Sequence, residues 1–332
     1  AIVSIGLLLR FTQILVDIGT LTSAFETRRP VLDLSHEILS APELPAPKGV
    51  RRTDEASASS GASVALEDVS FSYDDNKVLS HVDLTVSARE RIALVGKNGA
   101  VKTTLANLLI GVIRPDEGRV LIEGEDYGVL SIKEIGERIG YVMQNPNQML
   151  VKDMIRDEIT LALKLRRVDQ KTIDEKLELV LGLCGLSKMR SWPVSALSYG
   201  QRKRVTIASI LVMQPKILIF DEPTAGQDYF HYREIMDFLD RLNREMGLTI
   251  LFITHDMHLA IEYTDRAVVM ADGEKIGDGD VFRMLSDPDI LRRASLKETS
   301  LCKLARRLGI EPEAFVRHFI EYERMVRRHD EQ

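Results

Sequence analysis

Short apolar runs alternate with helical patterns through the middle of the chain. The runs RIALVG (91–96), KILIF (216–220) and LTILFIT (248–254) have the length of strands, and helical patterns lie between them. A strand that is apolar at every position is buried on both faces, as in a parallel sheet covered by helices. The pattern predicts an α/β fold built on a central, mainly parallel sheet.

Two other patterns precede and interrupt this core. The stretch VALEDVSFSYDDNKVLSHVDLTV, which starts at Val64, alternates apolar and polar residues around a turn at 74–76 and predicts an antiparallel β subdomain. From about 145 to 200 the pattern is mostly helical, as in DEITLALKL, which predicts a helical subdomain inserted into the core. Together these parts predict one domain over 64–283.

The chain after this domain also has a helical pattern. Pro312 stands near the start of a helical segment. One face of that segment carries the apolar residues Phe315, Val316, Phe319 and Ile320. We therefore predict a C-terminal helical extension over 284–332 that packs by this face.

The first 40 residues are the most apolar part of the chain. Arg10 and Asp17 interrupt the apolar run, so it falls short of the roughly 20 uninterrupted apolar residues that span a bilayer. Two interpretations stay open for 1–40: the end of a membrane helix of a preceding domain, or an amphipathic helix that packs on another surface. Residues 41–63 are rich in Pro, Ala, Ser and charge and are predicted to be a linker.

The composition narrows the function classes. The formal net charge is −6, which argues against a nucleic-acid-binding domain, because such domains usually carry an excess of positive charge. The two cysteines, Cys184 and Cys302, lie far apart in the sequence and offer neither a disulfide framework nor metal-ligand spacing. We expect both to be small buried apolar residues in a protein of a reducing compartment.

The strongest local motif directly follows the first apolar run and opens a helix. It consists of Gly96, Lys97, Asn98, Gly99, Ala100, Val101, Lys102, Thr103 and Thr104. Backbone N–H groups of such a turn, together with the helix N-terminus, form a concave site for phosphate. Lys102 supplies a positive charge for the β- and γ-phosphates of a nucleotide, and the Thr103 hydroxyl can ligate Mg²⁺.

Val101 departs from the phosphate-loop pattern G-x-x-x-x-G-K-[ST], which has glycine at this position. The loop requires close approach of the backbone to phosphate, and glycine adopts conformations that a β-branched residue resists. Taken alone, the altered motif is also compatible with a strand, a turn and a helix that bind no ligand.

A second motif supports nucleotide binding. The apolar residues 217–220 are followed by Asp221 and Glu222. A parallel strand that ends at the ligand crevice delivers such carboxylates to the phosphate site. We expect Asp221 to hold Mg²⁺ through water and Glu222 to polarise the attacking water. For this motif in isolation, an ordinary acidic turn after a strand is the alternative.

The order of these motifs points to a family. The chain from about 64 to 283 resembles the nucleotide-binding domain of ATP-binding-cassette (ABC) transporters, which has a P-loop NTPase fold. The specific evidence is L-S-Y-G-Q at 197–201, which is similar to the family signature L-S-G-G-Q except at Tyr199. The resemblance implies that Ser198 and Gly200, with Gln201 beside them, contact the γ-phosphate of an ATP bound to the opposite domain.

The stretch after the signature, RKRVTIASILVM, predicts a helix whose N-terminus points at that phosphate. Its basic residues are Arg202, Lys203 and Arg204. We expect them on a solvated helix face, although such a cluster could be misread as a nucleic-acid patch.

Four further positions match the family in order. By resemblance, Gln144 touches Mg²⁺ and reports the nucleotide state to the membrane partner, and His255 contacts the γ-phosphate. Asp228 matches the loop between facing domains, and Tyr73 matches the aromatic residue that stacks on adenine through an exposed ring face. A lone histidine or tyrosine near a strand is more often structural, but the order of the motifs favours the functional interpretation.

Within the family, the chain most resembles the ATPase subunits of energy-coupling-factor importers, which take up vitamins and transition-metal ions. The stretches YVMQNPNQM, LSYGQRKRVTIAS and FDEPTAGQD and the helical tail carry this resemblance. It implies an ATPase that uses ATP and Mg²⁺, pairs with a second ATPase domain, and powers membrane-embedded subunits from the cytoplasmic face of the cell membrane as a peripheral protein.

Three alternatives stay open. The N-terminal segment looks more like the last membrane helix and linker of an ABC exporter half-transporter. Val101 could make the chain a catalytically impaired nucleotide-binding partner of an intact ATPase domain. A soluble cassette protein of DNA repair or translation is the third alternative, although such proteins usually lack this C-terminal extension.

Overall fold

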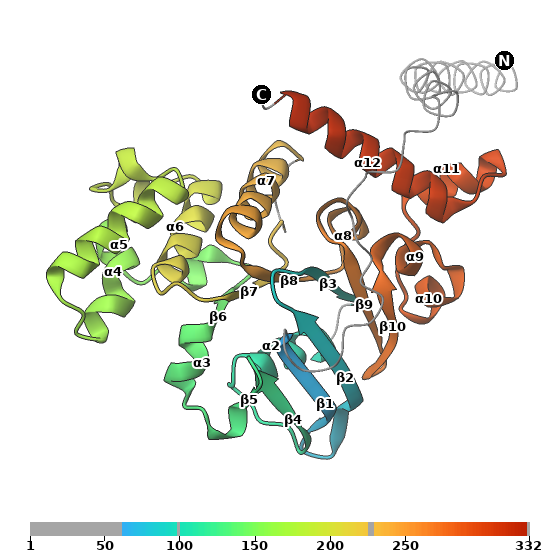
Figure 1. Ribbon diagram of the computed structural model, residues 1–332, viewed down its shortest axis with the longest axis horizontal. Helices are drawn as coiled ribbons and strands as arrows, with labels where there is room; N and C mark the ends of the chain where they lie inside the picture. The colour runs from blue at the N-terminus through green and yellow to red at the C-terminus, as the bar shows by residue number, and fades with distance from the viewer. Residues whose placement is uncertain (1–61, 98–99, 225–228, 331–332) are drawn as a thin grey trace, which may run out of the picture. The chain divides into compact units, whose positions relative to one another are not determined.

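The apolar runs of the sequence become neighbouring parallel strands in the computed structural model, which describes residues 62–97, 100–224 and 229–330. A six-stranded sheet has the strand order β10-β9-β3-β8-β7-β6 (Figure 1). Its members are β3 (Arg91–Gly96), β6 (Ile139–Val142), β7 (Ile217–Asp221), β8 (Thr249–Thr254), β9 (Arg266–Ala271) and β10 (Glu274–Asp280). All neighbours pair in parallel except β10, which is antiparallel to β9. The predicted α/β fold with a mainly parallel sheet is confirmed.

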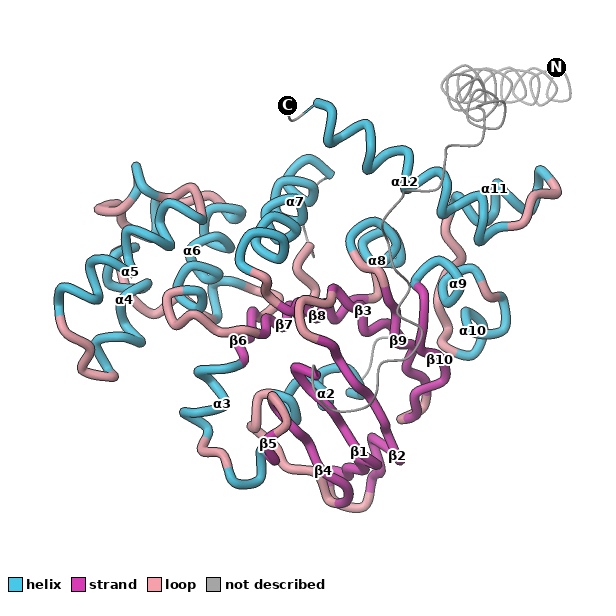
Figure 2. The backbone as a smooth tube through the Cα atoms, viewed as in Figure 1, coloured by secondary structure: helices cyan, strands magenta, loops and turns pink. Residues whose placement is uncertain are grey.

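This sheet is buried on both faces, which explains why its strands are apolar at every position. Along β7, Ile217 and Ile219 join a core cluster with α2 (Ala100–Leu109), whereas Leu218 and Phe220 join a cluster with α7 (Tyr229–Met246) on the other face. Figure 2 shows α7 and α8 (Met257–Tyr263) on one side of the sheet and α2 on the other.

The antiparallel subdomain is also confirmed. The strands β1 (Ala62–Tyr73) and β2 (Asn76–Ser87) form a hairpin whose closing pair is Tyr73 and Asn76. Asp74 turns the chain with a φ of 50°, a left-handed conformation that Asp tolerates better than most residues. The sheet continues in the order β2-β1-β4-β5, with β4 at Glu117–Ile122 and β5 at Glu125–Asp126.

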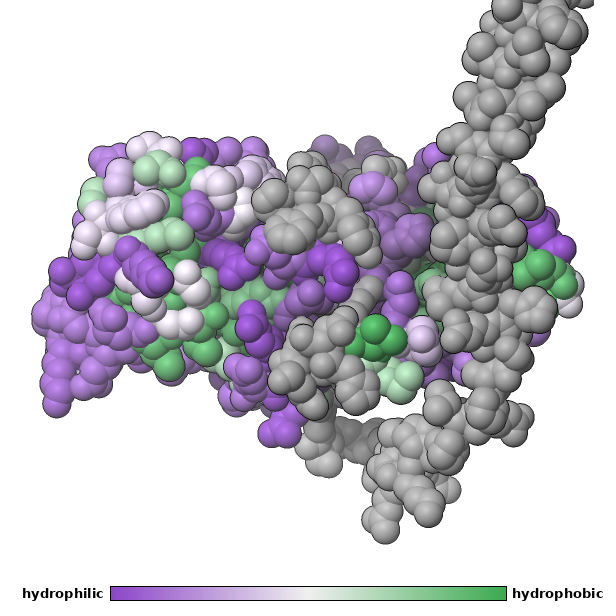
Figure 3. Space-filling view, turned by 90° about the horizontal axis from the view of Figure 1, so that it is seen from above, coloured by the Kyte–Doolittle hydropathy of each residue, from purple (hydrophilic) through white to green (hydrophobic). Residues whose placement is uncertain are grey.

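The region between β6 and β7 is helical, as its pattern predicts. Its helices α4 (Ile155–Leu165), α5 (Gln170–Leu183) and α6 (Tyr199–Leu211) share one core cluster, in which Cys184 is fully buried. Figure 3 shows hydrophobic residues at the surface among hydrophilic ones at this end of the domain. Val151 and Leu165 are among the exposed apolar side chains there, with 66% and 76% of their surface accessible.

The C-terminal extension packs by the predicted face. It contains α10 (Pro288–Arg293), α11 (Ser300–Leu308) and α12 (Pro312–Asp330). On α12, Phe315, Val316 and Ile320 are buried in a cluster with Cys302 of α11, and Phe319 packs against its margin. The same cluster includes side chains of α8 and α9 (Val281–Ser286), so the extension is attached to the core of the preceding domain.

The remaining helix of the core is α3 (Ile132–Arg138), which begins with a capping box between Ser131 and Glu134. Across the described ranges, no helix combines the length and apolar character needed to cross a membrane. The predicted leader, 1–40, and all but the last two residues of the predicted linker, 41–63, lie outside the described residues.

Candidate functional site

The candidate site lies where parallel strands end. In register, Val95 of β3 pairs with Thr254 of β8, and Asp221 of β7 pairs with Ile253 of β8. The carboxyl ends of β3, β7 and β8 therefore meet at one edge of the sheet. This edge brings the phosphate motif after β3, the carboxylates after β7 and His255 after β8 together from distant parts of the sequence.

Gly96 begins the phosphate motif, and the sheet itself requires glycine at this position. A Cβ built on Gly96 would lie well inside van der Waals contact with the carbonyl oxygen of Met270 on β9. Asn98 and Gly99 lie outside the described residues, and Ala100 is the first residue of α2. The structure thus places the start of α2 directly behind this strand end, as the motif predicts.

Lys102 points back over the motif. Its side chain is buried, with 5% of its surface accessible, and its Nζ donates a hydrogen bond to the Gly96 carbonyl oxygen at 2.7 Å. Burial lowers the pKa of Lys102, and the negative charges of Glu222 and Asp221 oppose that shift. A phosphate would offer this ammonium group a stronger, charged acceptor than a backbone carbonyl.

The two threonines of the motif face different ways. Thr103 is exposed, so its hydroxyl is available to a metal ion or phosphate. Thr104 is buried in the core, with 1% of its surface accessible. Any nucleotide contact from Thr104 would therefore come from its backbone N–H rather than from its side chain.

Val101 lies inside α2 and packs partly against the core cluster below it. It is absent from the residues with positive φ, so its backbone does not need the left-handed conformation that glycine favours. The expectation that a β-branched residue would resist the backbone conformation at this position is therefore wrong. Val101 could then affect phosphate binding only by steric hindrance, because its side chain occupies space beside the backbone that would approach a phosphate.

The carboxylates after β7 are held by hydrogen bonds. Tyr141 of β6 donates its hydroxyl to Asp221 Oδ2 at 2.9 Å. Burial is the main cause that raises the pKa of Asp221, while the Tyr141 hydrogen bond acts in the opposite direction. Tyr141 could not be identified from the sequence, because only strand pairing places β6 beside β7.

Glu222 directly follows β7, and its side chain is fixed by three contacts with residues at the end of β8. Its Oε2 accepts a hydrogen bond from Thr254 Oγ1 at 3.0 Å, and its Oε1 accepts one from the His255 backbone N–H at 3.1 Å. The His255 ring Nδ1 lies 2.6 Å from the same Oε1. Glu222 has a φ of 43°, an uncommon backbone conformation of the kind that clusters at functional sites. Glu222 and His255, each of which was predicted for the site, are thus in direct contact.

The oxygen donors at this edge fit Mg²⁺. No group of three or more His, Cys, Asp or Glu residues able to hold a metal is found within the described ranges. Mg²⁺, however, is usually bound through one or two carboxylates, with waters and substrate phosphates as the other ligands. Asp221, with the exposed hydroxyl of Thr103 and the amide of exposed Gln144, is consistent with that kind of site.

The signature residues form the start of α6. Ser198 caps this helix in a capping box: the Ser198 N–H donates to Gln201 Oε1 at 3.0 Å, and the Gln201 N–H donates to Ser198 Oγ at 3.3 Å. Ser198, Gly200 and Gln201 line a cavity of about 380 Å³ between α6 and its neighbours. α6 contacts β6, the edge strand, whereas the phosphate motif follows β3 inside the sheet (Figure 1).

The basic residues after the signature do not all lie on a solvated face, and for Lys203 that expectation is wrong. Lys203 has 1% of its surface accessible, and its Nζ donates to the carbonyl oxygens of Gln144 at 2.9 Å and Met143 at 3.2 Å. Burial lowers its pKa to about 8, and Asp221 opposes the shift. The sequence contained evidence for this burial. Lys203 lies three and four residues before Thr206 and Ile207, which are buried, and residues at this spacing share one face of a helix.

Tyr73 and Asp228 complete the predicted set. Tyr73 ends β1 with 43% of its surface accessible, and its ring packs edge-on against Phe71 with the centroids 4.8 Å apart. An exposed aromatic ring is compatible with the predicted stacking on adenine. Asp228 lies outside the described residues.

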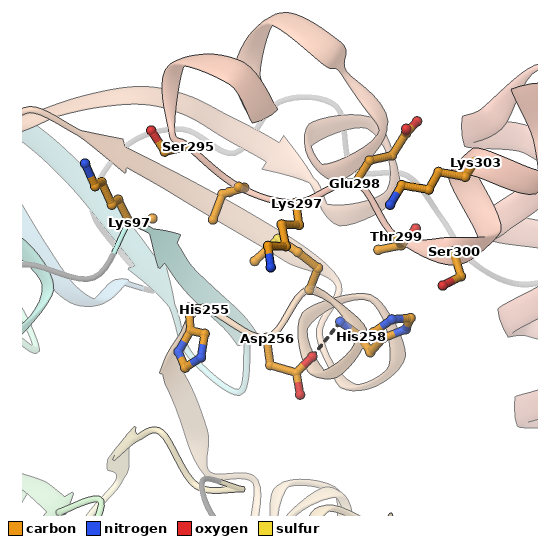
Figure 4. A pocket seen from close by; sticks show the side chains of 13 residues that line it. Lys97, His255, Asp256, His258, Ser295, Lys297, Glu298, Thr299, Ser300 and Lys303 are labelled. Carbon is orange, nitrogen blue, oxygen red and sulfur yellow. Dashed lines mark hydrogen bonds between the residues drawn. The ribbon is translucent and has the colours of Figure 1, made fainter. Parts of the chain in front are cut away.

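A cavity of about 640 Å³ adjoins the site and has a wall from the C-terminal extension. It extends from Gly96 and Lys97 past 255–258 to the segment 295–303, which comprises the loop after α10 and the first residues of α11. Figure 4 shows Lys297 projecting from that segment toward the wall that carries His255 and Asp256. Asp256 is engaged locally, because it caps α8 by accepting hydrogen bonds from the His258 and Leu259 N–H groups. The position of 295–303 near the phosphate motif could not be predicted from the sequence.

Known proteins similar to this chain belong to the family that the sequence motifs resemble. Residues 79–225 match the family described as ABC transporter. Proteins named as ABC transporter ATP-binding proteins from Enterococcus faecalis and Streptococcus pneumoniae are 53% and 52% identical to this chain, over 79% and 74% of its length. The matched regions cover 46% and 44% of those proteins, so the chain spans about half the length of the curated relatives it matches.

One solved structure resembles this chain over the full length of the solved protein. This is cbiO1 from Clostridium perfringens, described as part of the ABC transporter complex cbiONQ. The TM-score is 0.66 with 30% sequence identity, and the match covers 75% of this chain and 100% of cbiO1.

Proposed function

Because this chain belongs to the ABC transporter ATPase family, we propose that it binds ATP with Mg²⁺ and hydrolyses ATP to power a membrane transporter. The observation that carries the proposal is the meeting of Lys102, Glu222 and His255 at one edge of the sheet, with Asp221 beside them. Phosphoryl transfer needs little covalent chemistry from the protein, so positioning and charge stabilisation supply most of the catalysis.

Each residue then has a role in the proposed reaction. Lys102 leaves the Gly96 carbonyl oxygen and binds the β- and γ-phosphates. Glu222, oriented by Thr254 and the His255 backbone, orients and polarises the attacking water. Mg²⁺ held near Asp221, Thr103 and Gln144 would neutralise charge on the phosphates.

We also propose that two such domains act together. Within one chain, the signature begins a helix beside the β6 edge, whereas the phosphate motif follows β3 in the middle of the sheet. A head-to-tail pair would allow Ser198 and Gly200 of each domain to reach the γ-phosphate on the other. The exposed start of α6 supports this arrangement, since helix N-termini attract phosphate.

A membrane-embedded partner would contact the helical region near Gln144. Val151 and Trp192, both in this region, expose 66% and 47% of their surface. Exposed apolar side chains of this size are typical of interaction sites. The chain would accordingly lie at the cytoplasmic face of the membrane as a peripheral subunit.

An energy-coupling-factor importer of a vitamin or metal ion is the transporter that we propose. Support comes from the similarity to the full length of cbiO1 and from the motifs YVMQNPNQM and FDEPTAGQD. An exporter half-transporter is the second candidate, favoured by the apolar segment 1–40. Co-purification separates them: small separate membrane subunits support the importer, whereas a membrane domain in the same polypeptide supports the exporter.

The catalytic proposal is tested with Glu222→Gln. We expect this variant to bind ATP normally, to lose at least about 100-fold in phosphate release, and to accumulate as an ATP-bound dimer, because the amide cannot polarise water as a carboxylate does. Glu274→Gln, at an exposed residue of β10, is the matched control and should behave as the wild type. Unchanged phosphate release in Glu222→Gln would contradict the catalytic role of Glu222.

A catalytically impaired nucleotide-binding partner is a further candidate, and Val101 is the observation that favours it. Its side chain stands directly ahead of Lys102, where the family pattern has glycine. In that case an intact ATPase domain on another chain would carry the hydrolysis. Val101→Gly distinguishes an active ATPase from a catalytically impaired nucleotide-binding partner.

A further inference from the structure

Lys203 is a buried cation to which the reaction scheme above gives no role. It lies in the second turn of α6, five residues after the signature serine Ser198. Only 1% of its surface is accessible. Burying an ammonium group is costly unless it is paired or hydrogen-bonded, so its surroundings indicate what it stabilises.

The partners of Lys203 belong to the loop after β6. Strand β6 ends at Val142, and Lys203 Nζ donates to the carbonyl oxygens of the next two residues, Met143 at 3.2 Å and Gln144 at 2.9 Å. These carbonyls have left the strand ladder, and a buried carbonyl without a donor is unfavourable. The ammonium group therefore supplies two donors at the point where the chain leaves the sheet.

Two neighbours of Lys203 on α6 contact the same loop. The Tyr199 hydroxyl donates to the Gln144 carbonyl oxygen at 3.3 Å, and Arg202 NH1 donates to Asn147 Oδ1 at 3.0 Å. The first two turns of α6 thus hold this loop, mainly through its backbone carbonyls, while the Gln144 side chain remains exposed.

We propose that Lys203 is a positioning residue that fixes the Gln144 loop to the signature helix, so that Gln144 and Ser198 keep one relative geometry and move together. The inference rests on the proposed function for its catalytic consequence, but the structural link is testable without nucleotide. A nucleotide contact made by Ser198 would be transmitted through α6 to the loop that faces the proposed membrane partner.

The first test measures the link itself by amide hydrogen exchange on the full chain without nucleotide. Lys203→Met keeps an unbranched side chain of similar length and removes every donor. We expect exchange of the backbone amides in 143–149, except at Pro146, to rise about tenfold or more, with protection of α7 and the central strands unchanged. Lys203→Arg, which keeps donors and charge, should restore part of the protection, and Lys133→Met on exposed α3 is the matched control. Unchanged exchange in 143–149, or an equal loss over the whole domain, would overturn the link.

The second test asks whether Lys203 acts through Gln144. For ATP hydrolysis, Lys203→Met should lower kcat about tenfold and leave the nucleotide Kd within about twofold, because Lys203 contacts the loop and not the phosphate motif. In a Gln144→Ala background, Lys203→Met should have little further effect, because residues that act as a unit are not additive. Additive losses would overturn the positioning role. A chain that neither binds nor hydrolyses ATP would refute the proposed function, and the exchange result would still decide the link.

Discussion

Val101→Gly tests the site because it changes two measurable quantities in opposite directions. The substitution removes an isopropyl group from the second residue of α2, immediately ahead of Lys102. It should lower the free energy of unfolding, because the side chain packs against the core. It should strengthen ATP binding, because the backbone of the phosphate motif then has free space beside it.

The loss of stability follows from the position of Val101 in α2. Glycine is less favourable than valine inside a helix by about 0.4 kcal/mol. The Val101 side chain is partly buried against the cluster that contains Leu105 and Leu109, so its removal forfeits about 1 kcal/mol of a full burial contribution of roughly 1.5–3 kcal/mol. The sum is about 1.5 kcal/mol, which corresponds to a decrease in Tm of about 3–6 °C for a domain of this size.

The gain in affinity follows from the phosphate contacts. A hydrogen bond from a backbone N–H to a charged phosphate contributes about 1.5–3 kcal/mol. If the valine side chain prevents one such contact, removing it should tighten ATP binding about 10- to 100-fold. The backbone at Val101 is already helical, so glycine is needed for space and not for an unusual φ.

Calorimetry with ATP and thermal unfolding of the same preparations measure both quantities. Val101→Ala is an intermediate control, because alanine removes most of the side chain and favours the helix. Val101→Gly combined with Lys102→Ala should lose the gain in affinity, since the ammonium group that pairs with the phosphates is absent. If Val101→Gly binds ATP no more tightly than the wild type, and the wild type already binds ATP, the valine is no obstruction. If neither protein binds ATP, the nucleotide site itself is refuted.

Three further predictions use other parts of the site. Gly96→Ala should destabilise the chain by about 3 kcal/mol, because the new Cβ would collide with the backbone of β9. The control Gly136→Ala, in open space on α3, should stabilise the chain by about 0.5–1 kcal/mol, and equal Tm changes in the two variants would contradict this prediction. Tyr141→Phe removes the hydroxyl that orients Asp221 and should raise the Mg²⁺ concentration for half-maximal ATPase activity about tenfold, and an unchanged Mg²⁺ dependence would exclude this role. The pKa of Lys203 is about 8 in the folded chain, below its ordinary value of 10.5, so the unfolded chain binds more protons between these pH values. Denaturant unfolding should therefore show the wild type gaining stability relative to Lys203→Met as pH rises through that window, by at most about 1.4 kcal/mol per pH unit. If the difference in free energy of unfolding between the two proteins instead falls with pH, Lys203 is not a buried cation with a lowered pKa.

Much of the fold could be predicted because local signals agreed with the final packing. The run at 91–96 is strand β3 with the predicted ends, and the apolar face of Phe315, Val316 and Ile320 is the buried face of α12. Periodicity reports which side of an element is buried, whichever neighbour covers it. The same information does not reveal that neighbour. The wall that 295–303 forms beside His255 was therefore not predicted.

Lys203 and Val101 show how a residue type alone can mislead. A lysine on a helix is usually solvated, yet Lys203 is buried because two carbonyls of the loop after β6 lie within reach of its Nζ. Val101 departs from the motif and raised the expectation of a strained backbone, yet its position inside α2 needs no positive φ. In both cases the surroundings, rather than the residue, determine the conformation and burial.

The sequence by itself determined the order of strands and helices and the residues that end each strand, because hydrophobic period and turn chemistry are local properties. Only the tertiary structure decided that β6, β7, β8 and β3 lie side by side, and therefore that Tyr141 bonds Asp221 and that Glu222 contacts His255. Strand order depends on how whole layers pack against each other, and the free energy of that packing is shared by residues far apart in the chain.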